Sequence, residues 1–180
     1  MKSLLTPGQI NLTIQRLAHQ IVESHLDLEN TVLIGLQPRG IFVSNRIVEA
    51  MKSIVDAGKI QYGKLDITFY RDDIRSSIHM ANETDINFSI ENKQVVLIDD
   101  VLWTGRTIRA ALDALLDFGR PAAVELCVLI DRRFSRQLPI QPNYIGRSID
   151  TYADQKVKVY WEEKDGRNAV ELIEKGEPLN

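Results

Sequence analysis

Val95-Val96-Leu97-Ile98-Asp99-Asp100-Val101-Leu102-Trp103-Thr104-Gly105-Arg106-Thr107 is the stretch that decides the fold of this chain. Its first four residues are apolar and predict a fully buried strand, followed by a polar loop. A helix is predicted over about 107–118, because apolar residues recur there at three- and four-residue spacing until Gly119 and Pro121. Residues 124–130 form another apolar strand. A strand, a helix and a strand in this order predict a βαβ unit and a parallel sheet.

The chain on both sides supplies elements of the same kind. Helices are predicted over about 8–24 and 41–55, and strands over 31–36 and 64–70. Shorter strands are predicted near 144–149, 157–161 and 169–173, with a hairpin turn at 163–168. The fold class is therefore α/β, with a central, mainly parallel sheet flanked by helices. Because we find no internal repeat or linker, we expect residues 1–180 to form a single domain.

Residues 71–92 lose all periodicity and are rich in Asp, Ser, Asn and Glu. About 20 residues without regular structure inside a compact domain usually form a functional segment such as a flap. We therefore expect a flap here.

The composition narrows the function classes. The net charge of −3 gives no overall reason to expect nucleic-acid binding, although a local basic face stays possible. Cys127 is the only cysteine, so no internal disulfide can form, and this agrees with a reducing compartment. No apolar run approaches the ~20 residues of a membrane span. We expect a cytoplasmic protein with no membrane contact, and we find no Cys/His cluster for a structural metal.

The chemistry of the chain is concentrated where the 95–98 strand ends. Ligands of open α/β sheets bind outside the carboxyl ends of the strands. Asp99 and Asp100 repel each other there unless a cation or hydroxyl donors neutralise them. Residues 104–107 then offer hydroxyls, backbone N–H groups and a guanidinium at a helix N-terminus, which is an anion site. A ribose 5-phosphate fits both halves, whereas the alternative is an acidic pair that merely caps a strand.

These thirteen residues resemble the phosphoribosyl pyrophosphate (PRPP) signature of type I phosphoribosyltransferases. The resemblance extends over nearly the whole chain to the PyrR family of pyrimidine-operon attenuators and uracil phosphoribosyltransferases. The stretches that carry it are Arg16-Leu17-Ala18-His19, Pro38-Arg39-Gly40-Ile41, Asp66-Ile67-Thr68-Phe69-Tyr70-Arg71-Asp72-Asp73, Gly119-Arg120-Pro121, Leu138-Pro139-Ile140 and Tyr144-Ile145-Gly146.

The resemblance implies a type I phosphoribosyltransferase fold with a small hood and a mobile flap, working as a homodimer or higher homo-oligomer. It also implies the transfer of the phosphoribosyl group from PRPP to uracil, which gives UMP and pyrophosphate with Mg²⁺. Asp99, Asp100 and the flap residue Arg71 would be catalytic, and the two aspartates would also hold the metal. The residues implied to bind PRPP are Pro38, Arg39, Gly40, Val101, Leu102, Trp103, Thr104, Gly105, Arg106 and Thr107.

Two other functions stay open. A purine (hypoxanthine or guanine) phosphoribosyltransferase is possible, because Arg133 and Phe134 stand where the family usually has Gly-His, in a segment expected to contact the base. An RNA-binding attenuator with little catalysis is the other. The family's RNA face would include Arg16, His19 and Arg147, and binding to operon leader RNA would respond to UMP.

One backbone prediction concerns Gln37-Pro38-Arg39-Gly40. Related transferases place a cis peptide in this loop, and proline lowers the penalty for a cis bond to ~0.5–1 kcal/mol. We therefore predict a cis bond between Gln37 and Pro38. The alternative is an ordinary trans proline at the start of the following helix.

Overall fold

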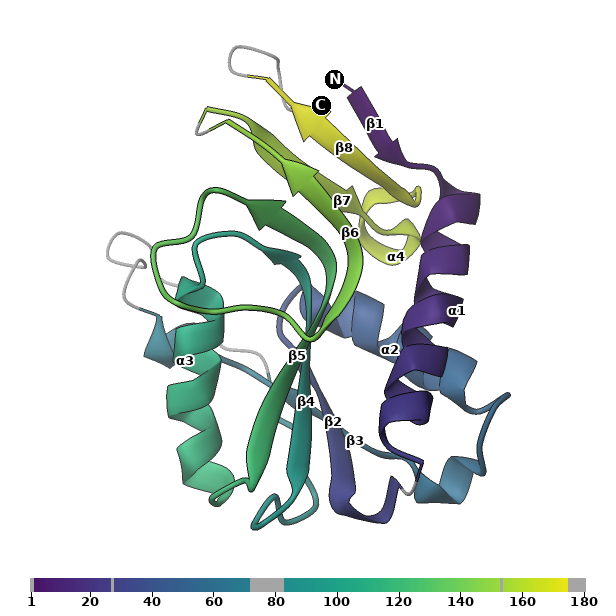
Figure 1. The fold of residues 1–180 in the computed structure, drawn as a ribbon, viewed down its shortest axis with the longest axis vertical. Helices are drawn as coiled ribbons and strands as arrows, with labels where there is room; N and C mark the ends of the chain where they lie inside the picture. Colours follow the sequence, from purple (N-terminus) through teal and green to yellow (C-terminus); the bar gives the residue numbers. More distant parts are fainter. Residues whose placement is uncertain (1, 27, 72–82, 153, 175–180) are drawn as a thin grey trace.

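A five-stranded parallel sheet forms the centre of the computed structural model, which describes residues 2–26, 28–71, 83–152 and 154–174 (Figure 1). All four pairs of neighbouring strands run parallel, so the predicted α/β class is confirmed. In their spatial order the strands are β3 (Gln61–Leu65), β2 (Thr31–Leu36), β4 (Gln94–Leu102), β5 (Ala123–Arg133) and β6 (Tyr144–Asp150).

Helices cover both faces of this sheet. The helices α1 (Pro7–Ser24) and α2 (Gly40–Met51) pack on one face, and α3 (Arg106–Leu115) packs on the other (Figure 1). In β4, Val96 and Ile98 belong to the core on the α1 and α2 side, whereas Val95 and Leu97 belong to the core on the α3 side. The continuous apolar run in the sequence follows from this burial on two faces.

A second, antiparallel sheet lies beyond the carboxyl ends of the central strands, and we call it the hood. It contains β1 (Lys2–Leu5), β8 (Ala169–Ile173) and β7 (Lys156–Tyr160), in that spatial order. The short helix α4 (Glu162–Asp165) connects β7 to β8 and ends at Gly166. The hood therefore pairs the first strand of the chain with the last one (Figure 1).

Several predicted boundaries were wrong. The strand predicted over 64–70 is β3 only as far as Leu65, and Thr68–Tyr70 is a 3-10 turn. The side chain of Asp66 stabilises that turn, because its Oδ1 accepts hydrogen bonds from the backbone N–H and the hydroxyl of Thr68. Other 3-10 turns are Leu28–Asn30, Ala57–Lys59 and Leu116–Phe118.

The most informative correction concerns β4. The sequence predicted a strand that ends at Ile98, but β4 continues to Leu102 and pairs with β5 as far as Asp131. Asp99 and Asp100 are thus strand residues and not loop residues.

Part of the predicted flap, residues 72–82, lies outside the described residues. The described residues 83–92 contain no helix or strand. Asp85 forms an isolated antiparallel β-bridge with Lys64 of β3. Within the described part of the chain, no helix combines the length and the apolar character needed to cross a membrane.

Candidate active site

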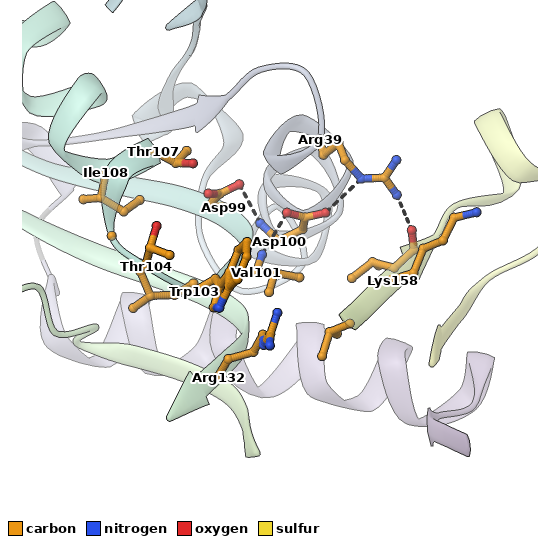
Figure 2. Close-up of a pocket in the computed structure, with 14 residues that line it drawn as sticks. Arg39, Asp99, Asp100, Val101, Trp103, Thr104, Thr107, Ile108, Arg132 and Lys158 are labelled. Carbon is orange, nitrogen blue, oxygen red and sulfur yellow. Dashed lines mark hydrogen bonds and ion pairs between the residues drawn. The ribbon is translucent and has the colours of Figure 1, made fainter. Parts of the chain in front are cut away.

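A cavity of about 350 Å³ lies between the carboxyl ends of β4 and β5, the start of α3 and the hood strand β7 (Figure 2). Most of the residues predicted to form the site meet in its wall. They are Arg39, Asp99, Asp100, Val101, Leu102, Trp103, Thr104, Gly105 and Thr107. The wall also contains Ile108, Arg132, Val157, Lys158 and Val159.

The loop between β2 and α2 approaches the acidic end of β4. The Gln37–Pro38 peptide bond is cis, so this prediction is confirmed. Gly40 lies directly against β4: a Cβ atom on this residue would be 2.6 Å from the carbonyl oxygen of Ile98 and 3.0 Å from Oδ1 of Asp99. Only glycine lets the loop and α2 pass this close to the acids. Pro38 and Gly40, which were predicted to bind PRPP, are not among the residues that line the cavity.

The carboxyls of Asp99 and Asp100 are both buried. The backbone N–H of Asp100 donates to Asp99 Oδ1 at 2.9 Å, and that of Val101 donates to Asp100 Oδ1 at 2.8 Å. Burial raises the pKa of Asp99 well above its usual range, and repulsion from Asp100 adds to this. Burial also raises the pKa of Asp100, although the charge of Arg39 opposes the rise. The nearby arginines therefore do not fully balance the negative charge of the two carboxylates.

Arg39 connects the acidic pair to the hood. Its Nε donates to Asp100 Oδ2 at 3.2 Å, and its Nη2 donates to the backbone carbonyl of Val159 in β7 (Figure 2). Asp165 of α4 lies 4.0 Å from the same Nη2. Arg71, the other predicted arginine, lies close enough to Asp99 for its charge to lower the pKa of that carboxyl, against the larger effect of burial.

The 103–107 loop turns the chain from β4 into α3. Gly105 has a φ of 93°, a left-handed conformation that glycine adopts without a steric penalty. The N-cap residue of α3, Gly105, has no side chain that could accept from the first turn, and the hydroxyl of Thr104 accepts a hydrogen bond from the backbone N–H of Arg106 at 3.4 Å. The first N–H groups of a helix have no partner within the helix, so those of this turn suit an anion beside Thr104 and Thr107. The side chain of Arg106 points elsewhere: its Nε donates to Gln137 Oε1 at 2.8 Å.

Sequence reasoning missed one buried cation in the wall. Arg132 is 3% exposed, and its guanidinium carbon lies 4.8 Å from the centroid of the Trp103 ring. Its Nε donates to Thr151 Oγ1 at 3.1 Å, and its Nη2 donates to the carbonyl of Gln155 at 2.8 Å. Burial lowers the pKa of Arg132. A charged residue directly after an apolar strand is the same signal that identified Asp99, so it could have identified Arg132 too.

The acidic pair also fits a Mg²⁺ ion that is shared with a ligand. Two buried carboxylates short of positive charge suit a hard cation that prefers oxygen. In the described ranges no group of three or more His, Cys, Asp or Glu side chains comes together as a complete metal site. Mg²⁺ commonly takes one or two carboxylates and completes its shell with water and phosphate oxygens. Asp99 and Asp100 are the residues that would hold it.

Comparison with known proteins agrees with this geometry. The family model described as a phosphoribosyl transferase domain matches residues 1–164. The bifunctional protein PyrR of Picosynechococcus sp. is 46% identical over 171 residues, which cover 94% of this chain and 96% of that protein. The bifunctional protein PyrR of Ligilactobacillus salivarius is 44% identical over 164 residues, covering 88% and 90%. The chain belongs to the PyrR family of phosphoribosyltransferases.

Solved structures extend the comparison to the fold. A hypoxanthine phosphoribosyltransferase from Staphylococcus aureus matches with a TM-score of 0.71 and 20% identity over 98% of this chain and 93% of that one. The enzyme from Trypanosoma cruzi matches with a TM-score of 0.72 and 19% identity over 97% of both chains. At this identity the likeness shows that this PyrR family member has the type I phosphoribosyltransferase fold, and it says nothing about the base.

Proposed function

We propose that the protein transfers the 5-phosphoribosyl group of PRPP to uracil, and that it also regulates pyrimidine operon RNA in response to UMP. One observation carries the catalytic half: a buried acidic pair near the end of β4 is followed by the N-terminus of α3, which has a glycine at its N-cap and Thr104 and Thr107 beside it. Membership of the PyrR family favours uracil. Among the comparisons, purine phosphoribosyltransferases share only a distant likeness of fold with this chain.

The reaction forms one bond and breaks one. N1 of uracil attacks C1 of the ribose and loses its proton, while the C1–O bond breaks and its electron pair leaves with pyrophosphate. Positive charge develops on the sugar as this bond breaks. Asp99 and Asp100 would accept hydrogen bonds from the ribose 2- and 3-hydroxyls and stabilise that charge electrostatically. Their burial strengthens the effect, because little water screens the two carboxylates.

The two phosphate ends of PRPP would be bound by different elements. Thr104 to Thr107 and the first turn of α3 would hold the 5-phosphate. Arg39 and Arg71 would hold the pyrophosphate, which requires Arg39 to exchange its bond to Asp100 for the substrate. Mg²⁺, when bound with PRPP at Asp99 and Asp100, supplies positive charge that offsets the pyrophosphate. Binding at both ends would fix C1 in front of the base.

The RNA half is supported by a local basic surface. Arg16, His19 and Arg147 are all exposed on α1 and β6. Arg16 connects these two elements by donating to the carbonyls of Ile145, at 3.2 Å, and Gly146, at 2.5 Å. Phosphate contacts from such residues would make RNA binding weaker as salt rises. We also propose that the protein is cytoplasmic and that it assembles as a homodimer or a higher homo-oligomer.

Two experiments test the two halves separately. Purified protein with uracil, PRPP and Mg²⁺ is expected to give UMP and pyrophosphate in equal amounts, measured by chromatography and a pyrophosphate assay. Pyrophosphate release without UMP would contradict the uracil assignment. For the RNA half, UMP-stimulated binding to the leader RNA of its own operon is expected to weaken in His19→Ala and to persist in Arg109→Ala on α3. Unchanged binding in His19→Ala would remove the assigned RNA face.

A further inference from the structure

The connection between β5 and β6 forms hydrogen bonds with the first residues of the 103–107 loop. Arg136 donates through Nη1 to the carbonyl oxygen of Trp103. The backbone N–H groups of Gln137 and Leu138 both donate to the carbonyl oxygen of Thr104, at 3.0 and 3.2 Å. Two consecutive carbonyls of the 103–107 loop are therefore satisfied by one neighbouring segment.

The same segment contacts the next two residues of the 103–107 loop. A Cβ atom on Gly105 would lie 3.2 Å from Ile140 Cδ1 and 3.4 Å from Leu138 Cβ, so these two apolar residues pack directly against the glycine. Gln137 accepts a hydrogen bond from Arg106 Nε at 2.8 Å. The segment Arg136–Ile140 thus touches every residue from Trp103 to Arg106.

Arg136 has the largest set of partners in this arrangement. Its Nη2 forms an ion pair with Asp131, whose side chain is 8% exposed at the end of β5. Its Nη1 donates to the carbonyl of Trp103 and, at 3.4 Å, to that of Arg132. One guanidinium therefore links the end of β5 to the beginning of the 103–107 loop. The planar fork of arginine suits such simultaneous contacts, whereas lysine offers a single ammonium.

We propose that Arg136–Ile140 is a brace that fixes the 103–107 loop in the shape that binds the 5-phosphate of PRPP, with Arg136 as its positioning residue. The proposal rests on the assignment of Thr104–Thr107 to the 5-phosphate. Arg136 is absent from the wall of the cavity that contains Thr104 and Thr107, so its effect on the 5-phosphate is expected to pass through its contact with Trp103. Small displacements of the residues that position a substrate weaken binding and catalysis strongly.

The brace predicts a selective loss of affinity. In Arg136→Met, the Kd for PRPP is expected to rise about tenfold, while the Kd for pyrophosphate, which lacks the 5-phosphate, changes less than about twofold. Calorimetry with Mg²⁺ measures both. The KM for PRPP is expected to rise with kcat nearly retained, because the 5-phosphate is bound in the ground state and the transition state alike. Arg136→Lys is expected to lose PRPP affinity about threefold.

A matched control is an arginine away from the cavity and from this connection. Arg167 is exposed, forms its ion pair with Glu171 at 2.8 Å, and is absent from the cavity wall. Arg167→Met is expected to bind PRPP and pyrophosphate like the parent protein. An equal loss for both ligands in Arg136→Met, or no loss for PRPP, would overturn the brace. If Arg136→Met does not fold, an unchanged ratio of the two Kd values in Arg136→Lys overturns it.

The outcomes distinguish a failure of the proposed brace from a failure of the proposed uracil phosphoribosyltransferase activity. Parent protein that binds PRPP but makes no UMP from uracil contradicts the proposed base, while the calorimetric comparison still tests the brace. Parent protein that makes UMP, together with Arg136→Met of unchanged PRPP affinity, contradicts the brace alone.

Discussion

Asp99 and Asp100 place two neighbouring, largely buried carboxyls in the cavity wall near the end of β4. Such an arrangement raises the free energy of the ionised state, so it is expected where a ligand or metal supplies the missing positive charge. Replacing both residues with Asn keeps their size, removes the charge and exchanges one acceptor oxygen of each carboxylate for an NH2 donor. The double variant is expected to fold and to lose roughly 10²-fold or more in kcat/KM, which corresponds to ~2.7 kcal/mol of transition-state stabilisation. Unchanged turnover of the folded variant would refute the assigned role.

The raised pKa of Asp99 also makes a prediction about stability, because its main cause is burial. A carboxyl whose folded-state pKa is raised stabilises the protein below its unfolded pKa of about 3.9, and this contribution is lost as the pH rises through the folded-state pKa. Asp99→Asn does not titrate. Its melting temperature relative to the parent protein is therefore expected to increase as the pH rises from about 4 to 8, measured without ligand. A difference between Asp99→Asn and the parent protein that stays flat across the range would contradict the burial argument.

At this scale the sequence predicted most of the site because its residues are neighbours in the chain. The 99–107 stretch brings acids, threonines and a glycine to one strand end. Every residue of this stretch except Arg106 lines the cavity. Arg106 was predicted to bind PRPP, but its Nε faces Gln137. That contact depends on where the β5–β6 connection lies, which no local pattern encodes.

Among the elements, the start of α2 is the one most sharply constrained by the site. Gly40 leaves no room for a Cβ between α2 and the backbone of β4. Gly40→Ala is expected to push α2 away from Asp99, to lower the free energy of unfolding by ~1–3 kcal/mol and to reduce activity at least about tenfold. Thermal melting and steady-state kinetics measure the two effects.

A glycine in α1 serves as the control for that substitution. Nothing lies within 4 Å of the Cβ position at Gly8, so Gly8→Ala is expected to leave activity unchanged and to stabilise the helix slightly. Wild-type stability and activity in Gly40→Ala would show that the close approach of α2 to β4 has no importance.

The elements themselves were predictable where the apolar pattern is long. The helix predicted over 8–24 is α1, and the strand predicted over 31–36 is β2. The pattern failed at strand ends, because β4 continues through two acids that the site buries and β3 stops at a turn made by the Asp66 side chain. Site requirements and side-chain turns override local propensity at such positions.

For the molecule as a whole, sequence reasoning predicted the strands that form β7 and β8 of the hood, but it missed β1 and the position of the hood beside the cavity. Lys2–Leu5 is too short to signal a strand, yet it pairs with β8 at the other end of the chain and leaves β7 facing the cavity. The pairing of β1, β8 and β7 therefore decides that the cavity wall contains Val157, Lys158 and Val159. The hood connects to the acids through Arg39, because the guanidinium of Arg39 donates both to Asp100 and to the backbone carbonyl of Val159.

The proposed function requires the protein to form a pyrimidine nucleotide in this cavity. The most direct measurement supplies uracil, hypoxanthine, guanine and adenine together, in equal amounts, with PRPP and Mg²⁺, and separates the product nucleotides by chromatography. Because all four bases compete for one site, the product ratio reports the ratio of their kcat/KM values. UMP is expected to exceed every purine nucleotide by roughly 10²-fold or more. A purine nucleotide as the main product would contradict the account.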